Sequence, residues 1–454
     1  METLTYKFTE DSFLYQQLYQ FIKDDILTGR LSHDEKLPSK RKLSQHLNLS
    51  QTTIEIAYQQ LQDEGFIYSK PKVGYFVETI ETLNKAPENT ISLISPKEET
   101  ARPTFKIEDS HQTSFPYHLF RKYAKEAFES EMSELLDRGH PQGEDALREQ
   151  IRRYLYHSRG VSCTNEQIIV GSSTEQLFTL VTRLLPGAVY QIEDPGYPLI
   201  RKVLHYEQKS YIPIEVDEEG IIVKSLHKKA NVVHVTPSHQ FPTGAVLSAK
   251  RRTELLKWTL KKDRYIIEDD YDSEFRYKGR PLKALQGLDS HQKVIYMSTF
   301  SKSIFPSIRV AYLVLPEPLM LKYHELAHKP NITVPRHIQY IIAQFMQSGE
   351  FERNINRTRK IYKKKLDIVV ETLKPFEDYL TISGEQAGMH CVLEFKQPIA
   401  KPDGINISLI SDYAEKNHKK YRQQLILGYG GIEDCSIKHE IQHLMNKIIQ
   451  KKET

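Results

Sequence analysis

Near its N-terminus the chain spaces its apolar residues with the period of helices and then with the period of strands. Apolar residues from Phe13 to Ile26 recur at helical spacing, and Gly29 supplies a stop. Ser39 and Ser50 stand where the N-caps of two further helices are expected. The pattern predicts helices near 13–26, 39–47 and 51–64, with Gly65 closing the last, and strands at 66–68 and 75–77.

Further along the chain, short apolar runs alternate with helical stretches. The expected strands are Gln167–Val170, Val189–Ile192, Val232–Val235, Tyr265–Ile267, Val294–Met297 and Val310–Val314. Buried strands separated by helices predict a mainly parallel sheet that is covered on both faces. After about residue 320 the pattern favours longer helices, such as 337–345 and 351–373, and then strands near 391–395 and 425–428.

A chain of 454 residues is too long for one ordinary domain. Residues 81–105 contain three prolines and few large apolar side chains, which is the composition of a linker. The predicted organisation is an N-terminal domain at 1–80, a linker at 81–105 and an α/β domain at 106–454. The α/β domain is expected to have a large part at about 120–320 and a small part at about 321–454.

Composition excludes several classes of protein. The net charge of +4 is small for this length, so any nucleic-acid contact must rest on a local basic patch. Cys163, Cys391 and Cys435 are far apart, which predicts neither a disulfide framework nor a metal site and fits a reducing cytosol. Neither a signal peptide nor an apolar run of about 20 residues is recognised, so we expect a soluble cytoplasmic protein without membrane contact.

Two helices joined by a tight turn and followed by a hairpin predict a winged helix-turn-helix, a DNA-binding fold. Over residues 1–80, nine Lys and Arg face eleven Asp and Glu, so the segment as a whole is not basic. The basic residues lie where a helix start and a wing tip would meet phosphates, and phosphate contacts supply much of the affinity for DNA. The alternative interpretation is a solvated, charged helix start.

Short polar side chains at the start of the third helix, Gln51, Thr52 and Thr53, are able to reach base edges in the major groove. The runs 37–43 and 49–54 resemble the N-terminal domain of GntR-type regulators. This resemblance implies an Arg in many relatives where Gln51 stands, and its loss favours adenine or looser base reading. The candidate DNA-binding residues are Lys36, Ser39, Lys40, Arg41, Ser50, Gln51, Thr52, Thr53, Lys70, Lys72 and Gly74.

A second set of polar residues follows the expected strands of the α/β domain. Lys302 lies in the run 298–302, Asp269 and Tyr271 precede it in the chain, and Arg309 follows it. Pyridoxal phosphate (PLP) needs such groups: a lysine for a Schiff base, a carboxylate beside the ring nitrogen and a cation for the phosphate. A lysine in a strand-to-helix loop is usually only solvated, but several such motifs in chain order favour a cofactor site.

Three further loops extend this interpretation. The run 171–174 follows a strand and opens a helix, so its N–H groups and hydroxyls suit a phosphate, although an ordinary N-cap looks the same. Tyr197 is placed to stack on the cofactor ring, although a packing role is the alternative. The run 234–244 resembles the Asn-Pro-Thr-Gly element of fold-type-I aminotransferases with Phe241 in place of Asn, so His239 or Gln240 is expected to take part of its role.

The order of winged helix, linker and aminotransferase-like domain resembles the MocR/GabR subfamily of GntR-type regulators across essentially the whole chain. The runs 236–244 and 268–277 are distinctive in this respect. The resemblance implies an α/β fold-type-I PLP-dependent aminotransferase-like domain and a head-to-tail homodimer. It implies Lys302 as the internal-aldimine lysine and sole catalytic residue, with Asp269 at the pyridinium, Tyr271 at the phenolate, Tyr197 stacked on the ring, and Arg309, Ser173 and Thr174 at the phosphate.

The hypothesis is a transcription regulator whose binding to promoter DNA responds to an amine or to PLP at Lys302. Relatives that sense γ-aminobutyrate resemble this chain but carry an Arg where Leu199 stands, so a carboxylate on the effector would need Arg201, Arg357 or Arg422. One alternative is an active aminotransferase with an accessory DNA-binding domain. The other is a constitutive repressor in which the cofactor is only structural.

Overall fold

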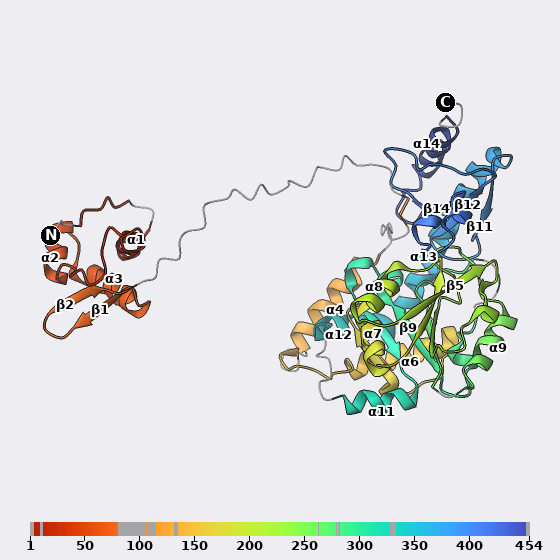
Figure 1. The fold of residues 1–454 in the computed structure, drawn as a ribbon, viewed down its shortest axis with the longest axis horizontal. Coiled ribbons are helices and arrows are strands. Elements are labelled where there is room, and N and C mark those ends of the chain that lie inside the picture. The colour runs from red at the N-terminus through yellow and green to blue at the C-terminus, as the bar shows by residue number, and fades with distance from the viewer. Residues whose placement is uncertain are drawn as a thin grey trace. The chain divides into compact units, whose positions relative to one another are not determined.

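The computed structural model describes residues 4–9, 12–79, 105–106, 115–130, 135–261, 263–277, 279, 282–326 and 333–450. Contacts divide the chain into two compact units, Met1–Glu99 and Thr100–Thr454 (Figure 1). The expected linker at 81–105 lies outside the described residues except for Phe105, which is buried in the second unit.

The described residues of the first unit form three helices and a two-stranded antiparallel sheet, as the sequence predicts. The elements are α1 (Leu14–Leu27), α2 (Lys40–Leu47), α3 (Gln51–Asp63), β1 (Ile67–Lys70) and β2 (Gly74–Val77). Leu18, Ile22, Leu43, Ile54 and Leu61 are fully buried between the helices, so one apolar face of each helix forms this core.

Local signals set the ends of these helices. Ser39 Oγ accepts a hydrogen bond from Lys42 N, and Ser50 Oγ accepts one from Thr53 N at 3.1 Å, so both predicted N-caps are confirmed. Asn48 ends α2 in the left-handed conformation, with φ of 54°, and this forms the tight turn between α2 and α3.

An eight-stranded sheet forms the centre of the second unit, in the order β3-β10-β9-β8-β7-β4-β5-β6. Its strands are β3 (Ile168–Gly171), β4 (Tyr190–Asp194), β5 (Tyr211–Asp217), β6 (Gly220–Ile221), β7 (Val232–Val235), β8 (Tyr265–Asp269), β9 (Val294–Thr299) and β10 (Ala311–Val314). Strands β5, β4, β7, β8 and β9 run parallel, whereas β10 is antiparallel to both neighbours and β6 to β5. The mainly parallel sheet is therefore confirmed.

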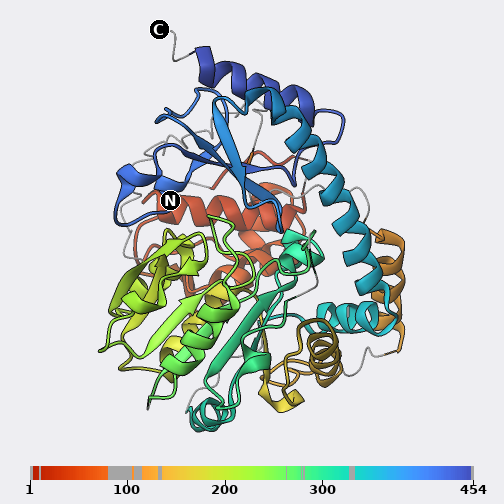
Figure 2. The same ribbon diagram turned by 90° about the vertical axis from the view of Figure 1, so that its right-hand side faces the viewer.

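Helices cover both faces of this sheet, as expected (Figure 2). They are α4 (Tyr117–Ser130), α6 (Asp145–Arg159), α7 (Thr174–Leu184), α8 (Pro198–Tyr206), α9 (Ala249–Trp258), α10 (Phe300–Ser303), α11 (Glu317–Glu325) and α12 (Arg336–Gln347). Successive residues of β3 point to opposite faces: Ile168 and Val170 pack with α6 and α12, whereas Ile169 packs with α7 and α11. The sheet thus separates two apolar cores.

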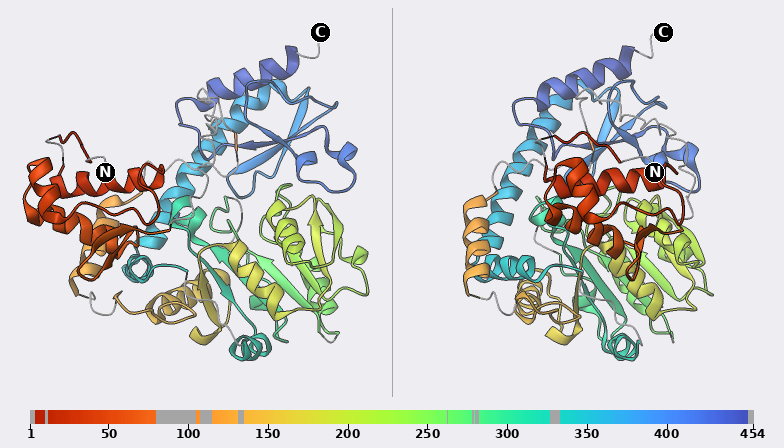
Figure 3. Two further views of the ribbon diagram at one scale, coloured as in Figure 1. Left: turned by 60° about the vertical axis from the view of Figure 1, so that its left-hand side comes forward. Right: turned by 90° about the vertical axis from the view of Figure 1, so that its left-hand side faces the viewer.

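A smaller sheet follows, in the order β11-β12-β14-β13 (Figure 3). Its elements are α13 (Glu350–Leu373), β11 (Leu380–Ser383), β12 (His390–Phe395), β13 (Ser408–Leu409), β14 (Gln424–Gly428) and α14 (Ile437–Gln450). Helix α13 joins the two cores, because Phe351 packs beside the large sheet and Leu366 beside the small one. The chain therefore leaves the core beside the large sheet and enters the core beside the small sheet within α13. The expected boundary was near residue 321, but the apolar face of α12 still packs against the large sheet.

In the described part of the chain, no helix combines the length and apolar character needed to cross a membrane.

Candidate cofactor site and DNA-reading face

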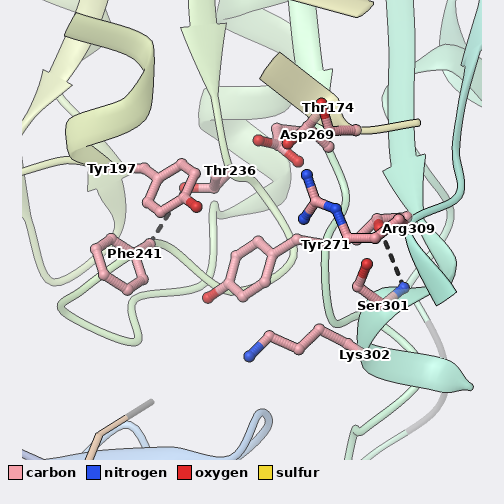
Figure 4. Close-up of a pocket in the computed structure, with 11 residues that line it drawn as sticks. Thr174, Tyr197, Thr236, Phe241, Asp269, Tyr271, Ser301, Lys302 and Arg309 are labelled. Atoms are coloured by element: carbon pink, nitrogen blue, oxygen red, sulfur yellow. Dashed lines mark hydrogen bonds between the residues drawn. The ribbon is translucent and has the colours of Figure 1, made fainter. Parts of the chain in front are cut away.

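Residues at the carboxyl ends of β3, β4, β7, β8 and β9, and Arg309 just before β10, meet around a cavity of about 150 Å³ (Figure 4). Such an edge is where ligands bind in open α/β sheets. The lining residues are Ser173, Thr174, Tyr197, Thr236, Phe241, Asp269, Tyr271, Thr299, Ser301, Lys302 and Arg309. The structure thus brings together seven of the eight candidate cofactor residues, whereas the eighth, His239, and its alternative Gln240 lie outside the lining.

Asp269 ends β8 and is buried at the floor of the cavity. Its Oδ2 lies 3.5 Å from His234 Nε2, while its Oδ1 has no hydrogen-bond partner among the residues that the structure describes. A buried carboxylate oxygen without a partner is costly unless a ligand satisfies it. A protonated ring nitrogen supplies that partner, so this oxygen fits the cofactor that the sequence suggested.

Tyr271 and Lys302 both line the cavity, and in Figure 4 their side chains extend toward the same side. Its hydroxyl shares a hydrogen bond of 3.2 Å with His239 Nδ1, which in turn lies 2.7 Å from Asp272 Oδ2. Burial raises the pKa of Tyr271 well above its usual range, and the charge of Asp272 adds to this, so the hydroxyl keeps its proton. His239, itself held by Asp272, therefore fixes the orientation of the Tyr271 side chain from outside the cavity lining.

Gln240, the other expected substitute for the missing Asn, also lies outside the lining. Its Nε2 donates to Glu193 Oε2 at 3.2 Å and to the Pro195 carbonyl at 3.0 Å, so its amide supports the loop after β4. Neither expected substitute for the Asn therefore lines the cavity.

One end of the cavity, lined by Ser173, Thr174 and Arg309, suits an anion. Ser173 caps α7, and its Oγ accepts from Gln176 N at 3.2 Å. Thr174 is the first residue of the same helix, where backbone N–H groups and the helix dipole favour negative charge. Arg309 adopts the left-handed conformation, with φ of 50°, and lines the cavity at this end, where its guanidinium can add a charge-assisted bond to a phosphate.

An aromatic wall closes the side that faces the smaller core. The Phe241 ring meets the Tyr197 ring edge to face at 5.4 Å and the Tyr413 ring at 5.0 Å. Phe241, Thr236 and Thr299 line the cavity but were not among the expected cofactor residues. Their position in the sequence was the available signal, because Thr236 directly follows β7 and Thr299 ends β9.

The arginines considered for an effector carboxylate do not enter this cavity. Arg201 Nη2 donates to the Tyr413 carbonyl at 3.0 Å, and Arg357 and Arg422 are exposed away from the lining. Within the described lining, Lys302 and Arg309 are the only cations.

The first unit presents Gln51 and Thr52 as exposed residues at the start of α3. Thr53 is engaged locally instead, because its hydroxyl shares a 2.7 Å hydrogen bond with Ser50 Oγ. The start of α2 and the β1–β2 turn contain the residues that are expected to contact phosphates. Exposed basic residues there are Lys36, Arg41, Lys42 and Lys72.

Two of the expected phosphate contacts already have acidic partners. Lys40 Nζ lies 2.5 Å from Glu55 Oε1, and Lys70 Nζ lies 3.0 Å from Asp34 Oδ1. Gly74 has φ of 136°, and a Cβ there would lie 3.2 Å from Lys36 Cε, so a glycine suits this position of the wing.

The sequence matches the family described as "Bacterial regulatory proteins, gntR family" over residues 14–77 and "Aminotransferase class I and II" over residues 111–427. It is 39% identical to the uncharacterized HTH-type transcriptional regulator YdeL of Bacillus subtilis, over 96% of this chain and 97% of that protein. It is 31% identical to the HTH-type pyridoxine biosynthesis transcriptional regulator PdxR of Corynebacterium glutamicum, over 87% and 88%. The crystal structure of a multiple substrate aminotransferase from Thermococcus profundus has a TM-score of 0.70 at 22% identity, covering 82% and 96%.

The similarity to solved aminotransferases extends over the second unit and confirms its fold-type-I architecture. An aminotransferase class I and II domain implies pyridoxal phosphate as the cofactor, and the buried Asp269 oxygen and the anion-binding end fit that molecule. A gntR-type winged helix implies DNA as a partner. The chain therefore belongs to the MocR/GabR subfamily of GntR-type transcription regulators, which join a DNA-binding winged helix to an aminotransferase-like domain.

Proposed function

We propose that this regulator senses an amine, or pyridoxal phosphate itself, at Lys302 and converts occupancy of the cavity into a change in DNA affinity. The observation that carries the proposal is the buried, unpartnered Asp269 Oδ1 in a cavity that also contains a lysine and an anion-binding helix start. These are the groups that the cofactor requires.

When bound, the cofactor supplies an aldehyde that exchanges between amines and a ring that withdraws electrons. Lys302 is the amine that would hold the aldehyde, and Asp269 would hold the protonated ring nitrogen. Tyr271 would donate to the phenolic oxygen, and Tyr197 would cover the ring. Ser173, Thr174 and Arg309 would hold the phosphate, as their place in the lining supports.

The effector follows from the remaining charges. With Arg309 used for phosphate and Lys302 for the aldehyde, the described lining offers an effector carboxylate no further cation. Leu199, in α8, packs against the apolar core that α7 and α8 share, and its side chain supplies no positive charge. We therefore favour a primary amine without a carboxylate, or the cofactor itself; the name of the similar PdxR, a regulator of pyridoxine biosynthesis, agrees with the second option.

The output is a change at the DNA. We propose a head-to-tail homodimer in the cytosol whose two winged helices bind half-sites spaced by a helical repeat. Within each winged helix, Gln51 and Thr52 would read bases, while Lys36, Arg41 and Lys72 would hold phosphates. An effector can alter DNA affinity only as far as it binds one conformation of the protein more tightly than the other. The coupling free energy between two such sites is typically about 1–3 kcal/mol.

The test joins chemistry to output in full-length protein. Incubation with pyridoxal phosphate should give visible absorbance, and borohydride reduction should leave a pyridoxyl group on the peptide that contains Lys302. DNA affinity should then differ between the cofactor-free and cofactor-bound protein. A protein that stays colourless and unlabelled would overturn the proposal.

One second function has a specific observation in its favour. Lys302, Asp269 and Tyr271 all line one cavity, as an active aminotransferase would require. Steady turnover of an amino acid with an oxo-acid, unaffected by deletion of residues 1–80, would favour that enzyme. A constitutive repressor would bind and regulate normally as Lys302→Ala.

A further inference from the structure

A second cavity lies in the same unit, beside the loop that follows β8, and its chemistry differs from that of the cofactor site. Its volume is about 660 Å³, which is within the range of small-molecule sites. The walls come from the end of α6, the loop after β8 and the first half of α13. We call it the basic cavity and define it by Arg159, Ser273, Glu274, Arg276, Lys283 and Arg359.

One of its arginines is already neutralised. Arg159 Nε donates to Asp270 Oδ2 at 2.7 Å, and its Nη2 donates to Ser238 Oγ at 2.6 Å. The carboxyl of Glu274 is the only one in the described lining, and it is buried. Burial, with help from the charge of Asp270, raises the pKa of Glu274 to about 7, so this carboxyl carries at most part of a charge at neutral pH.

Three cations remain. Among the described residues, no carboxylate lies within ion-pair distance of Arg276, Lys283 or Arg359. A cavity with this excess of positive charge attracts and concentrates anions.

One of these arginines has a donor without a partner, and a second arginine is held in a fixed position. Arg276 Nε is buried and has no hydrogen-bond partner in the part of the chain that the structure describes. Arg359 is fixed in place, because its Nε donates to the Glu274 carbonyl at 2.7 Å and its Nη1 to Asn356 Oδ1 at 2.9 Å. A buried donor left unsatisfied costs about 1–3 kcal/mol, which a bound anion would offset.

The end of α6 does not cancel this charge. Gly160 N donates to the Tyr156 carbonyl at 3.2 Å, and Val161 N donates to the Leu155 carbonyl at 3.2 Å. The last carbonyls of the helix are thus capped, and the negative end of its dipole is partly compensated.

We propose that the basic cavity binds a small anion with two or more negative charges, carried by phosphate or carboxylate groups. Such a ligand would lie between Arg276 on the loop after β8 and Arg359 on α13. The same loop follows Asp269 and contains Tyr271 of the cofactor site, and α13 continues into the smaller core. An effect of the anion on sensing rests on the proposed function, whereas the binding itself does not.

The test is calorimetric titration of full-length protein with pyrophosphate and, separately, with citrate, in excess pyridoxal phosphate so that the cofactor phosphate site is filled. We expect saturable binding of at least one probe. Pyrophosphate alone indicates phosphate ligands, and citrate alone indicates carboxylates. Arg276→Gln and Arg359→Gln should each weaken binding at least tenfold.

The matched control is Lys360→Gln, which removes one charge from an exposed position of the same helix and should leave the affinity within twofold. Arg309→Gln should also leave it unchanged, because Arg309 lines the other cavity. Unfolding midpoints of all variants check folding. Absence of binding, equal weakening by Lys360→Gln, or loss in Arg309→Gln would overturn the anion site, and each outcome leaves labelling of Lys302 as a separate question.

Discussion

At the scale of single residues, the cofactor site depends on polar atoms that the fold buries without partners. Asp269 shows this most clearly, since one carboxylate oxygen lies 3.5 Å from His234 Nε2 and the other has no hydrogen-bond partner among the described residues. Tyr271 is held differently, through His239 and Asp272, so that its hydroxyl is both positioned and kept protonated. A ligand that donates a hydrogen bond to the unpartnered oxygen of Asp269 should therefore stabilise the folded protein.

Replacing Asp269 by Asn should weaken binding of pyridoxal phosphate by about 10- to 100-fold, because an amide no longer stabilises the protonated ring nitrogen and the loss amounts to roughly 1.5–3 kcal/mol. Absorbance titration of the variant measures this. Asp263→Asn, an exposed change of the same kind six residues earlier, is the control and should bind as wild type. Equal affinity of the Asp269 and Asp263 variants would contradict the assignment.

Glu274 should make stability fall as pH rises. Its pKa is raised to about 7 in the folded protein by burial and by Asp270, while Tyr154, Arg159 and Asp272 also face it. The unfolded chain ionises near its ordinary value of about 4.3, so folding holds the extra proton between these values. The stabilisation is complete below about pH 4 and is lost as pH rises through about 7, on the order of 1–3 kcal/mol.

Denaturant unfolding of wild type and Glu274→Gln at pH 5 and pH 8 measures this effect. The wild type should lose more unfolding free energy than the variant over this interval. A pH dependence that is the same in both proteins would show that Glu274 ionises normally.

At the scale of elements, the proposed DNA contacts lie on the wing and at the helix starts, and intramolecular ion pairs predict which lysines contribute most to DNA affinity. Lys70 shares its charge with Asp34 and lies over the Phe76 ring at 4.3 Å, whereas Lys72 at the wing tip is exposed. A DNA phosphate must compete with Asp34 for Lys70, whereas Lys72 can contact a phosphate without such competition.

Lys72→Gln should therefore lower affinity for duplex DNA more than Lys70→Gln does. Fluorescence anisotropy over a series of salt concentrations is the measurement, and Lys72→Gln should reduce the slope of log affinity against log salt by about one contact. A larger loss for Lys70→Gln would mean that the Asp34 pair opens on DNA and that the ranking is wrong.

Elements were predictable from sequence where local signals agree. Ser39 and Ser50 caps, the αL turn at Asn48 and the buried strands β7 to β9 all follow from residue type and spacing. Strand β5 was not predicted, because Pro213 and Glu215 interrupt its apolar pattern and it lies near the edge of the sheet.

The site was predictable in part for the same reason. Residues with one distinctive chemical role, such as Lys302, could be found, but Thr236 and Phe241 reach the cavity only because β7 ends beside β4 and β8. The roles of His239 and Gln240 depend on which neighbours they meet across the fold, and spacing along the chain contains no such information.

At the scale of the whole molecule, the chain joins a DNA reader to a cofactor domain that has its own large and small cores. Helix α13 packs in both cores, and the aromatic wall of the cavity includes Tyr413 packed against Phe241. A ligand in the cavity can thus change the contacts between the large and small cores. If the ligand binds one arrangement of the two cores more tightly, the population shifts toward that arrangement.

The most direct test measures affinity for one duplex, selected from a random pool by the wild-type protein, in wild type and Lys302→Ala with and without pyridoxal phosphate and primary amines. Addition of the cofactor, or of an amine to the cofactor-bound protein, should change wild-type affinity by about 5- to 150-fold. Lys302→Ala should fold, bind the duplex and show no such response. A wild-type affinity that is the same in every condition, or a Lys302→Ala protein that responds like wild type, would contradict the account.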